Sequence, residues 1–269
     1  MENTSKKYLV GAASRFIHER ATTGGASFSL DELIAKTGLS VVAARNQLLR
    51  IGDRIARISP RQQFFLIVSP EHHVFGAPPV EWWLDDYMQW LASPYYLALL
   101  SAATVHGSSP QAIQQTQVMT DQPRRDIVVG RVHIKFFMKS AIGNTLKQQL
   151  PNAYAPLLLS TPESTMFDLV RYAHKLGGIE RMGETIAPML RKIKVPTLRK
   201  VLEAEQEIAT SQRLGFVLEA INAPKLAEVV EKWLPGKLQP VPLSNYTANS
   251  KRADPNARWG VINNTGSFA

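Results

Sequence analysis

The chain has 269 residues, 45% of them hydrophobic, with 31 Lys and Arg against 22 Asp and Glu. This length and composition suffice for two modest domains with real cores, while the absence of cysteine excludes disulfides and thiolate metal sites. The net charge of +9 favours a polyanionic partner over an acidic small substrate. No apolar run approaches about 18 residues and no signal peptide is apparent, so we expect a cytoplasmic protein that does not enter a membrane.

Helical spacing and capping residues predict three helices at the N-terminal end. The first helix is expected over residues 6–22 and ends before two glycines. Ser29, followed three residues later by Glu32, predicts a capping box that opens a second helix to Lys36. Gly38 suits the left-handed end of that helix, and Ser40 can cap a third helix that runs to about residue 53.

Two β-prone segments follow, around a break that contains Pro60. They predict a hairpin over residues 54–69. Helix, helix-turn-helix and hairpin is the order of a winged helix. The excess of positive charge is concentrated here, because residues 1–68 hold ten Lys and Arg against five Asp and Glu.

The third predicted helix has one apolar and one polar face. Ala44, Leu48 and Ile51 recur at helical spacing and should pack inward, together with Ile55. The opposite face carries amide and guanidinium groups, which pair with base edges in the major groove, and the hairpin adds arginines that would reach phosphate. The alternative is a three-helix core with a merely solvated face, but the turn, the wing and the local charge together favour DNA. The predicted DNA-binding residues are Ser40, Arg45, Asn46, Gln47, Arg50, Arg54, Arg57, Arg61 and Gln62.

The remaining residues predict a second, larger domain. Prolines at 70, 78 and 79 indicate a linker over residues 71–82, so the expected division is a winged helix-turn-helix at 1–70 and a C-terminal domain at 83–269. Segments 115–120, 131–137 and 155–160 predict a small sheet, and residues 162–233 predict several helices, with Pro188 kinking or splitting one of them. After an extended tail, residues 258–262 are expected to dock as a strand or a short segment. The expected fold class is therefore α+β.

Groups that resemble catalytic or metal sites have simpler explanations. Glu163 and Asp168 are five residues apart on a predicted helix and should point about 140° apart, which disfavours acid-base pairing, and Thr161 is expected to cap that helix. His72 and His73 lack a third ligand at metal spacing. His106 and His174 are expected to be structural. We therefore predict no catalytic residue, metal or cofactor.

A second basic concentration lies in the predicted C-terminal domain, at residues 191–200. A solvated helix end, extra phosphate contacts and a surface for an acidic partner all remain open for it. The residues concerned are Arg191, Lys192, Lys194, Arg199 and Lys200.

Several segments in a fixed order resemble the AbiEi antitoxins of type IV toxin-antitoxin and abortive-infection systems. They are "AARNQLLRIGDRIARISPRQQFFLIVSPE", "YYLALLSAATVHGSSPQAIQQTQVMTDQPRR", "GRVHIKFF", "LLSTPESTMFDLVRY" and "ARWGVINN". The resemblance implies an N-terminal winged helix that binds inverted repeats in the promoter of its own operon and represses transcription. It also implies a C-terminal domain that counteracts a nucleotidyltransferase-like toxin, with direct contact between the two proteins left open. A monomer in solution that pairs on DNA is compatible with this role.

Enzyme classes that act on nucleic acids need residues that the chain lacks. Gly107-Ser108 is not followed by the paired carboxylates of a nucleotidyltransferase, and in "HIK" at residues 133–135 a histidine stands where a restriction nuclease has glutamate. Motifs for a phosphate loop, a nucleophile elbow or a zinc hydrolase do not appear. A winged-helix transcriptional regulator with a ligand-sensing C-terminal domain remains the competing interpretation.

Overall fold

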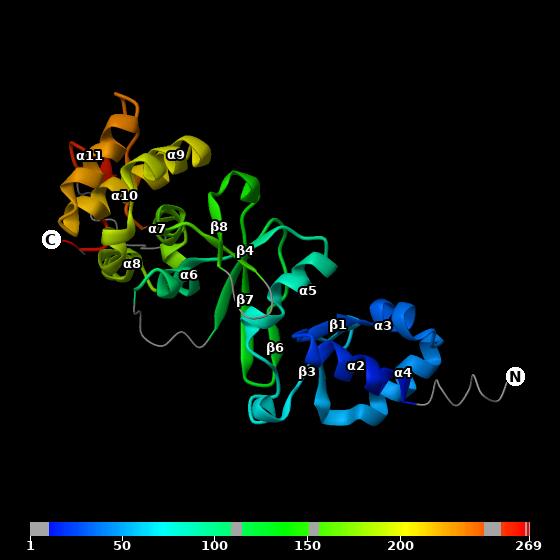
Figure 1. Cartoon of the computed structure of the whole chain (residues 1–269). Coiled ribbons are helices and arrows are strands. Elements are labelled where there is room, and N and C mark those ends of the chain that lie inside the picture. The colour runs from blue at the N-terminus through cyan, green and yellow to red at the C-terminus, as the bar shows by residue number, and fades with distance from the viewer. Residues whose placement is uncertain (1–10, 109–114, 151–155, 245–253, 267, 269) are drawn as a thin grey trace, which may run out of the picture. The chain divides into compact units, whose positions relative to one another are not determined.

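The structure, a computed structural model, describes residues 11–108, 115–150, 156–244, 254–266 and 268. The chain divides into two units: Met1–Tyr95, Gln114–Met138 and Gln149–Leu158 form unit 1, and Tyr96–Ile113, Lys139–Gln148 and Leu159–Ala269 form unit 2 (Figure 1). Helices and strands occur in both units, which confirms the α+β class. Residues 114–138, which were predicted to lie in the C-terminal domain, belong to unit 1. The predicted boundaries of the two domains, with a linker over residues 71–82, remain a prediction.

Three helices with well-defined ends begin unit 1: α2 (Ala12–Thr22), α3 (Leu30–Thr37) and α4 (Val41–Ile51). Ser29 Oγ accepts the Glu32 N–H at 3.1 Å, and Ser40 Oγ accepts the Ala43 N–H at 3.2 Å, so both predicted hydroxyl caps are confirmed. The return bond of the predicted capping box is replaced by an ion pair of Glu32 with Arg20. Gly38 has the left-handed φ of 68° that the turn requires. The Glu32 carboxylate binds Arg20 Nη1 at 2.7 Å. Residues 6–10 of the first predicted helix lie outside the described residues.

A three-stranded sheet accompanies these helices, in the order β1-β3-β2. β2 (Ile55–Arg57) and β3 (Phe64–Ile67) pair antiparallel, with Ile55 opposite Ile67, so the predicted hairpin is confirmed. β1 (Ser27–Ser29) pairs antiparallel with β3 on its other side. Strand β1 is not recognisable in the sequence, because three residues are too few to show a β-type alternation.

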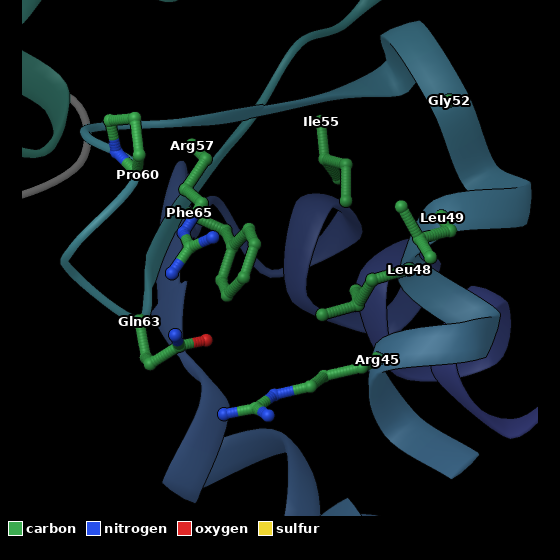
Figure 2. A pocket seen from close by; sticks show the side chains of 9 residues that line it. All are labelled: Arg45, Leu48, Leu49, Gly52, Ile55, Arg57, Pro60, Gln63 and Phe65. Atoms are coloured by element: carbon green, nitrogen blue, oxygen red, sulfur yellow. The ribbon is translucent and has the colours of Figure 1, made fainter. Parts of the chain in front are cut away.

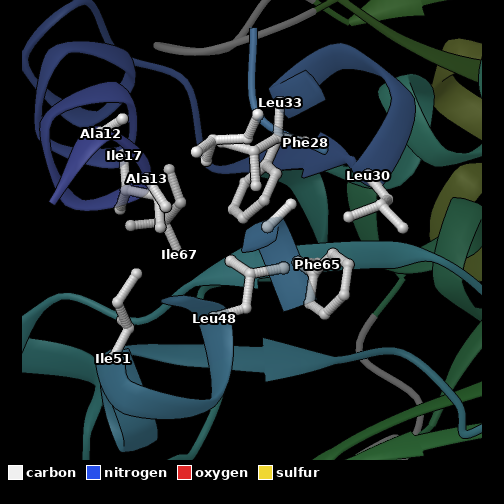
Figure 3. Packing of buried hydrophobic residues seen from close by; sticks show 12 residues of the cluster. Ala12, Ala13, Ile17, Phe28, Leu30, Leu33, Leu48, Ile51, Phe65 and Ile67 are labelled. Carbon is white, nitrogen blue, oxygen red and sulfur yellow. The ribbon is translucent and has the colours of Figure 1, made fainter. Parts of the chain in front are cut away.

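The core of this part of unit 1 brings the helices against the sheet (Figure 3). Ala44, Leu48 and Ile51 of α4 are buried as predicted, at 0%, 5% and 7% exposure. Phe28 of β1 stacks on Phe65 of β3 with ring centroids 5.4 Å apart. Complete burial of one such large apolar side chain contributes about 1.5 to 3 kcal/mol, so α4 is held by its inner face and its outer face is left to solvent.

The remainder of unit 1 contains η2 (Pro70–His72), η3 (Val80–Trp82), α5 (Leu84–Trp90), β5 (Thr116–Thr120), β6 (Ile127–Val129) and β7 (Val132–Met138). β5 and β7, both predicted, pair parallel, and β6 pairs antiparallel with β7. The predicted linker is packed, since Ala77, between the two short 3-10 turns, and Val80, the first residue of η3, are both buried. Helix α5 joins the N-terminal elements: Asp86 Oδ2 accepts the Ser27 hydroxyl at 2.8 Å.

Unit 2 is mostly helical. Its helices are α6 (Leu99–Val105), η4 (Ile142–Asn144), α7 (Pro162–Arg171), η5 (Ala173–Lys175), α8 (Ile179–Ile186), η6 (Ala187–Lys192), α9 (Val195–Glu205), α10 (Ile208–Ala220) and α11 (Pro224–Trp233). Strands β4 (Tyr95–Leu97), β8 (Lys147–Leu150) and β9 (Leu157–Ser160) lie where the chain passes between units, and Leu97 pairs parallel with Leu159. Pro188 splits α8 from η6, as predicted.

The C-terminal residues dock in unit 2 as a short strand, which confirms the prediction for residues 258–262. β11 (Val261–Ile262) pairs parallel with β10 (Val241–Pro242). The Trp259 ring is fully buried against Gly215 of α10, so closely that a Cβ at Gly215 would overlap it. Gln212 donates to the Trp259 carbonyl oxygen at 2.8 Å.

His106, at the end of α6, is a buried structural histidine. Its side chain is 3% exposed, and Nε2 lies 2.8 Å from the Ser160 carbonyl oxygen, to which it donates. Burial lowers the pKa of His106 below 6.5, and the positive charge of Lys192 lowers it further. The hydrogen bond to Ser160 raises this pKa and so offsets part of the shift.

We expect this lowered pKa to appear in the pH dependence of stability. The unfolded chain takes up the His106 proton near pH 6.5 and the folded chain only below it, so the free energy of unfolding should fall as pH drops through 6.5 toward the folded pKa. His106→Gln should flatten that part of the profile, measured by urea denaturation at a series of pH values. Equal slopes for the two proteins would contradict the assignment.

Candidate nucleic-acid interface

The outer face of α4 is open to solvent, opposite the buried side. Arg45, Asn46 and Arg50 are exposed, as the sequence predicts, and so are Arg54 and Arg61 beyond the helix. Two aliphatic residues share this face: Val42 is 69% exposed and Leu49 is 79% exposed. Val42 and Leu49 were not among the predicted interface residues, which were chosen for their polar side chains.

A groove of about 630 Å³ lies between α4 and the β2–β3 hairpin. Figure 2 shows the polar ends of Arg45, Arg57 and Gln63 extending into it, from the helix on one side and the hairpin on the other. Its apolar lining is Leu48, Leu49, Ile55, Pro60 and Phe65. The groove therefore offers guanidinium and amide donors above an apolar floor.

Arg57 is held in place by two contacts. Its Nε donates to the Gln62 carbonyl oxygen at 2.7 Å, and its guanidinium carbon lies 5.9 Å from the centroid of the Phe65 ring. A guanidinium over an aromatic face is stabilised by the ring quadrupole. Because the side chain is already oriented, less conformational entropy is lost when it binds an anion.

Besides Arg57, three further residues of the predicted interface have structural contacts. The Gln47 amide oxygen accepts the Ala13 N–H of α2 at 2.9 Å, so Gln47 is used inside unit 1 and we leave it out of the exposed surface. Gln62 donates to the Tyr87 hydroxyl at 2.8 Å, and its amide oxygen accepts the Ser59 hydroxyl at 3.1 Å. Ser40 is exposed, but its hydroxyl caps α4. These contacts depend on packing partners that helical spacing does not reveal.

A second hollow, of about 460 Å³, lies between the tip of the hairpin and the loop that joins β5 to β6. Arg61 of the tip and Arg124 and Arg125 of the loop line it, together with Asp126. The buried Nε of Arg124 has no hydrogen-bond partner among the described residues. Burial raises the pKa of Tyr87 in the same hollow. Arg124 and Arg125 were missed because they lie more than 60 residues along the chain from Arg61 at the tip of the hairpin.

The adjacent histidines do not form a metal site within the described residues. His72 Nδ1 lies 3.0 Å from the Ser69 hydroxyl, whereas His73 Nδ1 lies 3.9 Å from Asp53. Across the described part of the chain, no group of three or more His, Cys, Asp and Glu side chains is arranged to hold a metal ion. Nor does any helix in that part have the length and apolarity to cross a membrane.

The basic patch of unit 2 is exposed, and parts of it also serve structural roles. All five residues named from the sequence are exposed. Lys192 Nζ lies 3.5 Å from the Val105 carbonyl oxygen at the end of α6, where a cation is favourable. The Lys194 N–H donates to the buried Glu163 carboxylate at 2.7 Å.

Unit 2 also contains a buried ionic cluster that the sequence analysis did not predict. Lys139 Nζ lies 2.9 Å from Asp168 Oδ1 and 2.6 Å from Glu205 Oε1, with side-chain exposures of 0%, 0% and 2%. Tyr96 donates to Asp168 Oδ2 at 2.8 Å, and Arg171 lies 3.6 Å from Glu205 Oε2. Burial raises the pKa values of Tyr96 and Glu205, and Lys139 opposes the shift of Glu205.

This cluster explains why the carboxylates of the α7 segment do not act as an acid-base pair. Asp168 binds Lys139 and Tyr96, whereas Glu163 binds the backbone of Lys194. Thr161 caps α7 by accepting the Ser164 N–H at 3.3 Å, as predicted. The two carboxylates thus have separate structural partners.

Comparisons with known proteins concern both the family and the fold. A crystal structure of the RV2827C protein from Mycobacterium tuberculosis is similar over 93% of this chain and 90% of that chain, with a TM-score of 0.62 and 16% identity, which shows a shared fold. A crystal structure of an antigenic nucleotidyltransferase-like protein from Paracoccidioides brasiliensis reaches a TM-score of only 0.36 at 9% identity, over 56% of this chain and 90% of that chain, so it supports no conclusion. No curated protein matches the chain.

The family comparison covers the centre of the chain. Residues 96–220 match the model of the AbiEi antitoxin C-terminal domain. They include α6 to α10 and the buried cluster around Lys139. The match confirms the resemblance seen in the sequence motifs: residues 96–220 are similar to the C-terminal domain of AbiEi antitoxins.

Proposed function

We propose that the N-terminal part of unit 1 is a winged helix-turn-helix that binds double-stranded DNA. In this proposal α3 and α4 form the helix-turn-helix, and β2 and β3 form the wing. The observation that carries it is the groove between α4 and the hairpin, because guanidinium groups enter it from both sides. Helix α4 would occupy the major groove and the wing the neighbouring minor groove.

Each part of the surface then has a defined role. The phosphodiester strand that separates the two DNA grooves would run between α4 and the wing, with Arg45 and Arg57 on its phosphates. Asn46 and Arg50 would read base edges by bidentate hydrogen bonds. The remaining cations would contact the backbone of the flanking DNA; they are Arg54, Arg61, Arg124 and Arg125.

At the level of the cell, we propose an antitoxin that also represses its own operon. The similarity of residues 96–220 to AbiEi antitoxins supports the antitoxin role and a toxin as the functional partner, which we propose is nucleotidyltransferase-like. The protein would bind promoter inverted repeats in pairs and act in the cytoplasm without catalysis or cofactor. The basic patch at residues 191–200 would be a secondary surface, for phosphates or for an acidic face of the toxin.

The proposal predicts two classes of substitution in gel shifts with the promoter DNA of the chain's own gene. Asn46→Ala or Arg50→Ala should cost about 1 to 3 kcal/mol of discrimination between this DNA and an unrelated duplex. Arg61→Ala should weaken both duplexes alike and lower the slope of log affinity against log salt by roughly 0.9. Unchanged binding by variants of both classes would refute the placement of DNA on this surface.

A further inference from the structure

The outermost positions of α4 are aliphatic rather than charged. Val42 and Leu49, at 69% and 79% exposure, are seven residues apart, so they lie within about 20° of each other around the helix. Asn46 lies between them, and Arg45 and Arg50 flank the row. The most exposed side of this helix therefore carries a row of three side chains, Val42, Asn46 and Leu49. A cationic side chain lies on each side of this row.

This arrangement restricts what can cover the row. Single exposed aliphatic side chains are common on protein surfaces, but these two are aligned, and the groups beside them are cationic. An apolar protein surface or a lipid tail would bury the two guanidiniums at a high desolvation cost. The partner should therefore present small apolar groups to the aliphatic side chains and negative charges to the arginines. The major groove of DNA does both, since thymine C5-methyl groups lie between the phosphates of the two strands.

We propose that Val42 and Leu49 contact thymine methyl groups and determine part of the sequence specificity of this protein. The inference rests on the proposed DNA binding. Seven residues of helix rise about 10.5 Å, which corresponds to roughly three base-pair steps of 3.4 Å. The preferred half-site therefore carries two thymines about three base pairs from each other, and the base that Asn46 reads lies between them. Adenine is the expected base at that position, because an amide side chain pairs best with adenine.

The test compares two duplexes that differ only in methyl groups. The promoter DNA of the chain's own gene is amplified with dTTP or with dUTP, since uracil pairs like thymine but lacks the C5-methyl group. We expect the full-length protein to bind the uracil duplex roughly tenfold more weakly, as two apolar contacts are lost. Val42→Ala and Leu49→Ala should each reduce the ratio of the affinities for the thymine and uracil duplexes. The double variant should bind the two duplexes equally.

The matched control is Val74→Ala, because Val74 is a 70% exposed valine of unit 1 outside the helices. It should discriminate between the duplexes as the wild type does. Tight but equal binding of both duplexes by the wild type would overturn the inference and leave DNA binding intact, whereas no binding of either would overturn both. If Leu49→Ala changed the oligomeric state of the free protein and left the ratio of affinities unchanged, the row would be an interface between copies, which also overturns the inference.

Discussion

Replacing Lys139 with methionine should lower the free energy of unfolding by about 3 to 5 kcal/mol. Lys139 is fully buried between the carboxylates of Asp168 and Glu205, at 2.9 and 2.6 Å. Methionine keeps most of the side-chain volume but removes the cation. Asp168 then loses its cationic partner and Glu205 keeps only Arg171, so the charge of the two buried carboxylates is no longer balanced. Urea denaturation followed by circular dichroism measures the loss.

The matched control is Lys232→Met. Lys232 forms an ion pair of the same length, 2.6 Å, with Glu228, but both side chains are more than half exposed. An exposed pair of this kind contributes little to stability, because water screens the attraction and both long side chains lose conformational freedom. A loss at position 139 no larger than the loss at position 232 would contradict the assigned role of the cluster.

A compensating variant separates charge from packing. Lys139→Met combined with Asp168→Asn and Glu205→Gln removes all three charges and keeps side chains of similar volume. Because the largest cost in the single variant is the uncompensated carboxylates, the triple variant should be more stable than Lys139→Met alone. A triple variant less stable than the single one would mean that the hydrogen-bond geometry of Asp168 with Tyr96 outweighs the charge balance.

Reversing the charge of Arg45 and Arg57 together should weaken promoter binding by roughly a thousandfold at physiological salt. Each arginine that becomes glutamate changes the local charge by two, because a phosphate contact is lost and a repulsion is added. The two substitutions together therefore remove the affinity of about four phosphate contacts, and each contact contributes about fivefold through counterion release. Both side chains extend into the groove beside α4, and neither is part of the buried core. The variant Arg45→Glu/Arg57→Glu should therefore fold normally.

The same variant should also separate the two proposed activities. Repression of a reporter behind the chain's own promoter should be lost, while growth rescue from the proposed toxin partner should be retained. The control Lys225→Glu/Lys237→Glu changes the net charge equally at two exposed positions of unit 2 and should affect neither. Retained repression by the groove variant, or equal loss with the control, would contradict a specific role for the groove.

Point variants are better suited to this separation than removal of residues 1–80. Phe64 packs edge-on against Tyr87 with ring centroids 5.3 Å apart, and Ser27 binds Asp86. Truncation would strip these partners from α5, which stays in the chain. Loss of toxin rescue after truncation would then report unfolding of unit 1 as well as loss of DNA binding.

The sequence by itself determined the features whose causes are local. Ser29, Ser40 and Thr161 cap helices within three residues of themselves, and Gly38 and Pro188 act on their own turn of backbone. The buried stripe of α4 follows from helical periodicity alone. The similarity of residues 96–220 to AbiEi antitoxins also followed from the sequence, because the order of motifs is a property of the chain.

Only the tertiary structure decided which distant residues meet. Lys139 joins Asp168 and Glu205 across 29 and 66 residues of chain, and Arg124 reaches the hollow beside Arg61 through strands whose pairing partners no local pattern specifies. Such contacts depend on how complete elements pack, and packing free energies are small differences between large opposing terms summed over the whole fold. The polar face of α4 was therefore readable from its spacing, whereas the groove that completes it required the hairpin to be in place.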